Sequence, residues 1–127
     1  MKGFIAWPVA ALMFVSVQVS ALCLNISESY TGVVPSDTEG TAFGPFTIAG
    51  DNGCLNANIS AMVSAGGAGR APEIYIQQAV GATWKIVAGN PLSANASWVG
   101  PFGTYRVVLR NPDAAPKSYS GTVRYGR

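Results

Sequence analysis

Alternation of apolar and polar residues, the pattern of a β-strand with one buried face, recurs along the chain from residue 22 onward. No stretch after residue 21 has the three-and-four spacing of apolar residues that an amphipathic helix needs. The clearest alternating segments are residues 22–27, 54–63, 74–77, 105–110 and 119–125. The pattern also predicts shorter strands at residues 43–48, 83–88 and 96–99.

Clusters of glycine, asparagine and proline separate these segments, as expected for turns. They lie at residues 51–53, 65–69, 89–91 and 111–113. Seven to eight short strands with one apolar face each predict an all-β, antiparallel β-sandwich, either jelly-roll or immunoglobulin-like. The two most regular strands, residues 103–110 and 118–125, are expected to pair as a C-terminal hairpin.

The first 21 residues have the features of a secretory signal peptide. Lys2 supplies a positive charge, residues 4–19 are mostly apolar, and Val19, Ser20 and Ala21 are the small residues typical of a cleavage site. The apolar stretch is short for a membrane span, which needs roughly 20 residues. We therefore expect residues 22–127 to form one secreted or periplasmic domain with no membrane span.

Two cysteines follow the expected cleavage site, Cys23 and Cys54. An exported chain meets an oxidising compartment, where pairing of cysteines is the default. Both cysteines alternate with the aliphatic residues of their strands and so belong to the polar side. The bond is therefore expected between neighbouring strands of one sheet or at strand ends, not through the core as in antibody domains.

Composition excludes several classes of chemistry. The chain has no histidine, which removes histidine-based catalytic triads and histidine-ligated metal sites, and its net charge of +2 is too small to indicate nucleic-acid binding. No cofactor motif is present, and no cofactor or enzymatic activity is expected. Asp37 and Glu39, which share one expected loop, are weak candidates for a calcium site together with Asp51.

Five residues are candidates for a binding face. If the two C-terminal strands pair, Arg106, Arg110 and Arg124 form a basic stripe on one outward face, which could meet an anionic glycan or a partner protein. Tyr75 points away from its apolar neighbours, and Trp98 lies in a poorly patterned segment, so both are expected to be exposed. Exposed aromatic side chains can stack on sugar rings.

Two further features bear on the surface. Trp84 has the same parity as Ile86 and is expected in the core. Asn25, Asn58 and Asn95 each begin an N-glycosylation sequon, and Asn25 and Asn58 lie on polar faces, but the glycine- and alanine-rich composition leads us to read these as chance matches.

The order of short motifs from residue 43 to residue 125 resembles the bacterial pre-peptidase C-terminal domain, a small jelly-roll sandwich. The matching segments are residues 46–50 (FTIAG), 74–76 (IYI), 103–107 (GTYRV) and the tyrosine-containing strand 119–125. The chain departs from that family at residues 70–73, where acidic residues that bind calcium are usual. The resemblance implies a non-catalytic module of exported proteins. A weaker similarity links the chain to virion, fibre and pilus sandwiches.

These observations predict an exported, non-catalytic module that binds a glycan or protein partner at or outside the cell envelope, as a monomer. An alternative is a structural subunit of a surface assembly such as a pilus, fibre or virion, because long alternating strands offer edges for pairing. A small secreted hydrolase inhibitor is a third possibility that the sequence leaves open.

Overall fold

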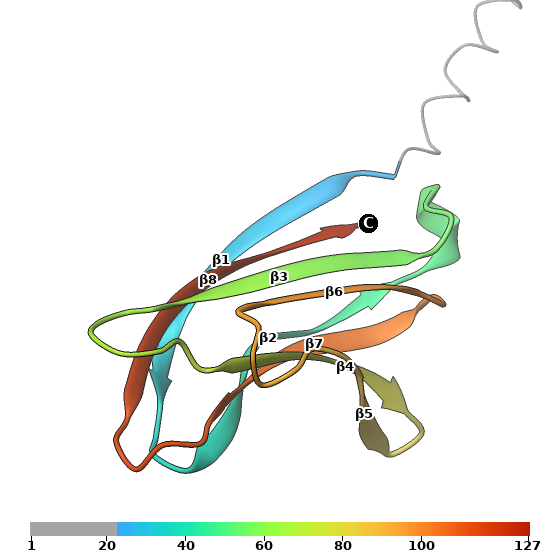
Figure 1. The fold of residues 1–127 in the computed structure, drawn as a ribbon. Helices are drawn as coiled ribbons and strands as arrows, with labels where there is room; N and C mark the ends of the chain where they lie inside the picture. The colour runs from blue at the N-terminus through green and yellow to red at the C-terminus, as the bar shows by residue number, and fades with distance from the viewer. Residues whose placement is uncertain (1–22) are drawn as a thin grey trace, which may run out of the picture.

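The computed structural model describes residues 23–127, and the predicted signal peptide lies outside them. Eight strands and one short 3-10 helix follow one another along the chain (Figure 1). No helix in the described part is long and apolar enough to cross a membrane. The elements are β1 (Asn25–Val34), β2 (Thr38–Ile48), η3 (Gly50–Asn52), β3 (Ala57–Ala65), β4 (Glu73–Val80), β5 (Thr83–Ala88), β6 (Asn95–Gly100), β7 (Gly103–Asn111) and β8 (Lys117–Gly126).

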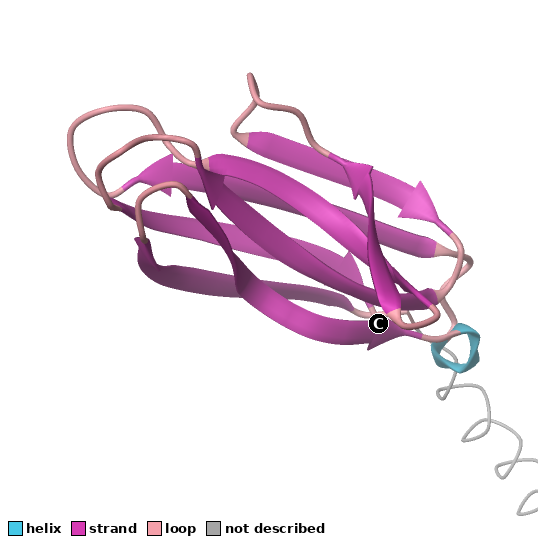
Figure 2. Cartoon of the chain, turned by 90° about the horizontal axis from the view of Figure 1, so that it is seen from below, coloured by secondary structure: helices cyan, strands magenta, loops and turns pink. Residues whose placement is uncertain are grey.

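The strands form two four-stranded antiparallel sheets packed face to face, with orders β1-β8-β3-β6 and β2-β7-β4-β5 (Figure 2). This is the all-β sandwich expected from the sequence, and the strand order is that of a jelly roll, not of an immunoglobulin domain. Of the seven consecutive strand pairs, β4–β5 alone shares a ladder; every other connection passes from one sheet to the other.

That topology corrects the predicted C-terminal hairpin. β7 lies between β2 and β4, whereas β8 lies between β1 and β3 in the opposite sheet. Their inner faces do contribute to one core: Tyr105, Val107 and Leu109 of β7 belong to the same buried cluster as Val123 and Tyr125 of β8. The alternation was therefore interpreted correctly within each strand, and the pairing of the two strands was wrong.

Several strand bounds also differ from the expected ones. β1 continues to Val34, seven residues beyond the predicted segment, and buries Tyr30 and Val34. β2 begins at Thr38, so the expected loop around Asp37 shrinks to a tight turn in which Asp37 has a positive φ of 57°. The weakest predicted strand is confirmed as β6. The predicted inward residues of β3, β4 and β7 are buried, as are Val123 and Tyr125 of β8, whereas Tyr119 is only partly buried. Leu55, predicted on the inner side of the same strand as Ile59, precedes β3 and is exposed.

Two glycines let tyrosine rings lie flat across β1 and β8. Tyr30 pairs with Gly121 and Gly32 pairs with Tyr119 in the ladder, so each ring covers the glycine opposite it. The hydroxyl of Tyr30 then reaches across β8 and donates a hydrogen bond of 2.6 Å to the carbonyl of Met62 in β3. A methyl group at either glycine would collide with a ring, so these positions need glycine for close approach.

Asn111 closes the end of the sandwich opposite the disulfide. Its side chain is fully buried; the amide nitrogen donates to the carbonyls of Val34, Pro35 and Ala115 at 3.2, 3.2 and 2.7 Å. Its side-chain oxygen accepts a hydrogen bond of 2.9 Å from the backbone N–H of Asp113. One side chain thus joins the β1–β2 turn to the β7–β8 loop, and so ties the two sheets together.

Candidate functional site

The three candidate arginines do not form one stripe. Arg106 and Arg110 point outward from β7 in the β2-β7-β4-β5 sheet, and Arg124 points outward from β8 in the other sheet. The two outer faces look in opposite directions, with the core between them (Figure 2). The predicted stripe required β7 and β8 to pair as a hairpin. Because they do not pair, the prediction of one basic stripe is wrong.

Arg106 is held by its own sheet. Its guanidinium lies 4.2 Å from the ring centre of Trp84, and its Nε donates a hydrogen bond of 2.8 Å to the side-chain oxygen of Gln77. Gln77 is itself buried, although it faces outward, because these side chains cover it. Arg106 therefore has cation–π and hydrogen-bond partners within the chain, and these contacts help to stabilise the fold.

The same contact corrects the placement of Trp84. Trp84 and Ile86 do share a face, as predicted, but it is the outer one, and Ile86 is 54 % exposed. A register shift in the β4–β5 ladder beside Ile76 changes the parity of β5, so that Val87 and Ala88 pack against the core instead. A bulge of this kind changes the direction of the side chains, and the alternation of apolar and polar residues in the sequence does not reveal it.

Tyr75 lies on the same outer face and points outward, as predicted, but its side chain is partly buried. Its hydroxyl donates a hydrogen bond of 2.7 Å to Glu73, and the same carboxylate forms an ion pair of 3.4 Å with Arg110. Partial burial and then the bond to Glu73 raise the pKa of Tyr75 to about 12. This face is thus a network of satisfied polar groups.

Trp98 is turned into the sandwich, which corrects its predicted exposure. It shares the inner side of β6 with Ala96, which is buried, and it packs against the core. Its Nε1 donates to the hydroxyl of Tyr105 at 3.3 Å, and that hydroxyl donates to the carbonyl of Pro101 at 2.6 Å. A signal was present in the sequence, because Asn95 and Ser97 alternate with Ala96 and Trp98.

The disulfide between Cys23 and Cys54 forms at strand ends, one of the two placements expected. Cys23 precedes β1 and Cys54 precedes β3, so the bond spans the end of β8, which lies between those strands. Leu24 and Arg127 extend the β1–β8 ladder beside it with reciprocal backbone hydrogen bonds of 2.9 and 2.7 Å. A side chain at Gly126 would meet both sulfur atoms.

A hollow of about 540 Å³ opens beside this disulfide on the outer face of β1, β8 and β3. Its lining has no carboxylate. It contains amide, hydroxyl and guanidinium groups, and its apolar parts include the disulfide, the exposed Leu55 and Tyr125. A second hollow of about 290 Å³ follows along β8. The first is lined by Cys23, Asn25, Gly53, Cys54, Leu55, Asn56, Asn58, Ser60, Arg124, Tyr125 and Gly126.

Both hollows lie on a surface that we call the polar face, formed by the outward residues of three strands. Serine, threonine and asparagine dominate it, and within the described residues Arg124 is its one charged member. In the ladder, Ser27 and Ser60 flank Arg124 on either side. The polar face comprises Asn25, Ser27, Ser29 and Thr31 of β1, Ser120, Thr122 and Arg124 of β8, and Asn58, Ser60, Met62 and Ser64 of β3.

The three sequon asparagines also share this side of the molecule. Asn25 and Asn58 line the larger hollow, and Asn95 is exposed on the neighbouring strand β6. An outward asparagine followed by an inward residue and an outward serine spells a sequon, so alternation on a serine-rich face produces these motifs by itself. The alternation therefore gives a structural reason why sequons occur here by chance, as expected from the sequence.

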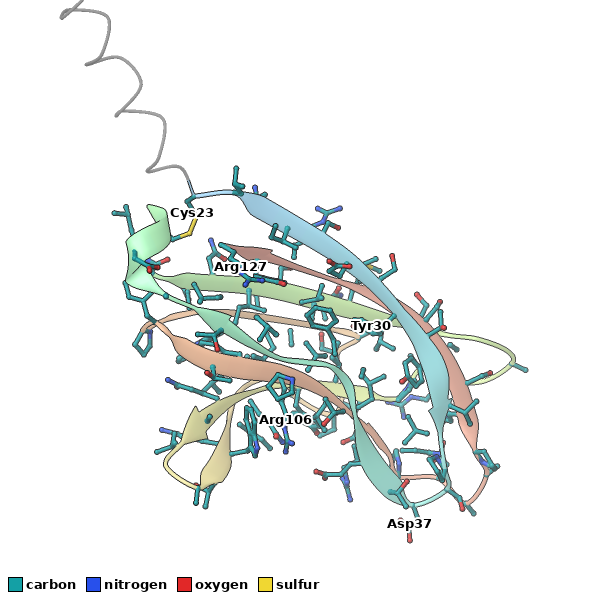
Figure 3. All side chains as sticks on the ribbon, turned by 180° about the vertical axis from the view of Figure 1, so that it is seen from behind. Cys23, Tyr30, Asp37, Arg106 and Arg127 are labelled. Atoms are coloured by element: carbon teal, nitrogen blue, oxygen red, sulfur yellow. A yellow bond between two sulfur atoms is a disulfide. The ribbon has the colours of Figure 1, made fainter. Side chains whose placement is uncertain are left out.

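The three carboxylates considered for calcium do not come together. Asp37 lies at the end of the sandwich opposite Cys23 and Arg127 (Figure 3), whereas η3, which holds Asp51, lies at the disulfide end (Figure 1). Glu39 belongs to β2 and sits opposite Arg110 in the ladder, not in a loop. Within residues 23–127, no group of three potential metal-ligating side chains occurs.

Sequence reasoning selected Arg124 but missed its surroundings. Asn56 and Leu55 precede β3, and Gly126 ends β8, so nothing in the linear pattern links them. The two cysteines were the available signal, because a bond at strand ends brings residues 23–25 and 53–56 to one place.

No family model matches the chain, and no curated protein matches its sequence. Among solved structures, the Yersinia pseudotuberculosis-derived mitogen is similar over 79 % of this chain and 86 % of its own, at 12 % identity and a TM-score of 0.54. The periplasmic g-type lysozyme inhibitor PliG of Aeromonas hydrophila covers 84 % and 89 % at 12 % identity, with a TM-score of 0.42. A Bacillus endospore appendage pilus protein covers 84 % and 91 % at 16 % identity, with a TM-score of 0.30. At these identities the first likeness concerns the fold alone.

Proposed function

We propose that this chain is an exported, non-catalytic module that binds a glycan at or outside the cell envelope through the hollow beside its disulfide. The observation that carries the proposal is the lining of that hollow: three asparagine amides, a serine hydroxyl and an arginine, with no carboxylate. Amides and hydroxyls donate and accept hydrogen bonds at once, which suits the hydroxyl groups of sugars. General acid–base catalysis would need a poised titratable group that this hollow lacks.

Two further features support the proposal. A disulfide indicates an oxidising compartment, in agreement with the predicted signal peptide. The jelly-roll topology agrees with the resemblance to the pre-peptidase C-terminal domain, whose members are non-catalytic modules of exported proteins. That family assignment and the secreted or periplasmic location are parts of the proposal.

The strand edges argue against the alternative of a filament or coat subunit. Glu28 on the edge strand β1 is in register with the buried Val123, so it lies on the inner side of its sheet. Lys85 on the edge strand β5 is in register with Gln78, which also lies on the inner side. Both edge strands therefore carry a charged, exposed residue on their inner side. β2 is interrupted by two register shifts, one of which includes Pro45, and β6 is only six residues long. These are the devices by which sheet proteins prevent edge-to-edge pairing. They favour a monomer.

A blocking substitution tests the site. Ser60→Trp places an indole in the hollow, and Thr41→Trp places the same group on the exposed edge strand β2 of the opposite sheet. On a glycan array and in pull-downs with envelope polysaccharide, the unaltered protein and Thr41→Trp should bind, whereas Ser60→Trp should not. No binding by any of the three proteins would refute the glycan module, and equal binding by all three would refute the location.

A further inference from the structure

We propose that the hollow on the polar face selects acidic glycans, and that Arg124 is the residue that recognises their carboxylate. This inference rests on the proposed function, because it names the ligand class of the same hollow. It is carried by the arrangement of one unpaired cation among neutral hydrogen-bonding side chains.

Arg124 differs from the other arginines of the two sheets in having no partner. Arg106 is bonded to Gln77 and stacked on Trp84, and Arg110 is paired with Glu73. Within residues 23–127, the Arg124 side chain makes no hydrogen bond or ion pair. A guanidinium has five N–H donors in a planar fork that matches a carboxylate with two parallel hydrogen bonds. The group is therefore free for a ligand of opposite charge.

The surroundings leave that charge unneutralised. The hollow contains no aspartate or glutamate, and the neighbours of Arg124 across the ladder are Ser27 and Ser60. The asparagines at positions 25, 56 and 58 complete the wall. A ligand that fits must offer one anionic group to the arginine and several hydroxyl groups to the amides and serines, which describes a uronic acid within a sugar chain.

The length of the polar face suits a chain, not a single sugar. The two hollows follow one another along β8, with Arg124 and Ser60 in the first and Thr122 and Met62 in the second. From the row of Asn25 to the row of Thr31 the strands rise roughly 20 Å at about 3.3 Å per residue. A saccharide of several rings lies along this distance.

A peptide fits this place poorly. β8 is hydrogen-bonded to β1 on one side and β3 on the other, so its backbone cannot accept an added strand. A docked helix needs a stripe of apolar anchors, whereas the exposed apolar side chains at the two hollows are Leu55 at one end and Met62 further along β8. The chemistry of the polar face therefore favours a glycan over a protein ligand.

Calorimetry with two matched polymers tests the inference: oligomers of polygalacturonate and the same oligomers after reduction of their carboxyl groups. The disulfide-bonded protein should bind the acidic form at least about tenfold more tightly, since a hydrogen bond to a charged group contributes about 1.5–3 kcal/mol. Arg124→Gln should bind both forms equally. Arg124→Lys should retain part of the preference, because it keeps the charge and loses the fork.

Arg110→Gln is the control, because it removes the same charge from the opposite face. It should keep the preference for the acidic oligomer and its salt dependence. Equal binding of both oligomers by the unaltered protein would overturn the inference and leave the glycan module standing. Loss of the preference in Arg110→Gln as well would show an effect of net charge alone and would also overturn it.

Two outcomes separate this inference from the proposed function. Binding of neither oligomer overturns the choice of acidic glycans, and the array experiment with Ser60→Trp then decides separately whether the hollow binds sugars. Binding of polyglutamate with the same dependence on Arg124 would show that the site reads a peptide carboxylate, which overturns the glycan as its ligand.

Discussion

Replacing Asn111 with alanine should destabilise the protein far more than a substitution in an ordinary surface turn, which is what the sequence predicts at residues 111–113. The amide nitrogen has two hydrogens, one directed at the carbonyl of Ala115 and one shared between those of Val34 and Pro35. The side-chain oxygen accepts from Asp113. Three hydrogen bonds are lost from a fully buried position, and at about 1 kcal/mol each the free energy of unfolding should fall by about 3 kcal/mol.

Urea denaturation followed by tryptophan fluorescence measures this difference. A domain of this size loses about 4 °C in Tm per kcal/mol, so thermal unfolding should shift by about 12 °C. Asn90→Ala is the matched control, because its side chain accepts one exposed hydrogen bond of 2.8 Å from Leu92 and should cost no more than about 1 kcal/mol. Equal destabilisation by the two alanine substitutions would refute the role of Asn111 as the tie between the sheets.

Three more predictions follow from the same structure. Val107→Asp places an unpaired charge in the core and should lower the free energy of unfolding by at least about 3 kcal/mol in the same urea experiment. Arg106→Ala removes the stacking on Trp84 and the hydrogen bond to Gln77, and should lower it by about 1–2 kcal/mol. Equal effects of the two substitutions would contradict the assignment of inner and outer faces. The raised pKa of Tyr75 favours its neutral form in the folded protein, so its contribution to stability is complete below pH 10 and is lost as the pH rises from 10 to 12. Glu73→Gln keeps an acceptor oxygen but removes the negative charge, so it should lower that pKa in an absorbance titration, and an unchanged titration would exclude the charge of Glu73 as a cause. Reduction of the disulfide, which closes a loop of 31 positions, should lower stability by about 3–4 kcal/mol, and thiol titration of the native protein should find no free cysteine; two reactive thiols would contradict the bond.

Much of the fold could be predicted because alternation is a local property. Ile59, Ile74, Val107 and Val123 all lie on the inner side to which their parity assigned them, and all four are fully buried. The pairing of the two cysteines followed from their number and the expected export. Each of these predictions needs only a strand and its period of two.

The candidate site could be predicted only in part. Arg124 was selected for its outward parity, which is correct, but it was grouped with Arg106 and Arg110 because consecutive strands are usually neighbours. In a jelly roll most consecutive strands belong to opposite sheets, so the common rule fails at every consecutive pair of strands except β4–β5. Trp84 was misplaced for a different reason, the register shift in the β4–β5 ladder.

The sequence by itself determined that this chain forms strands, which residues of most strands face inward, and that its two cysteines pair. Only the tertiary structure decided which sheet each strand joins, and with it that Arg124 stands alone in a hollow walled by the disulfide, while Asn111 is buried as a tie between the sheets. The physical reason is that the direction of a side chain depends on neighbours in the chain, whereas a hollow depends on contacts between residues such as 23, 54 and 124 that are far apart along it. Those contacts are set by how the connections cross between the sheets, and the alternation of residues is the same whichever way they cross.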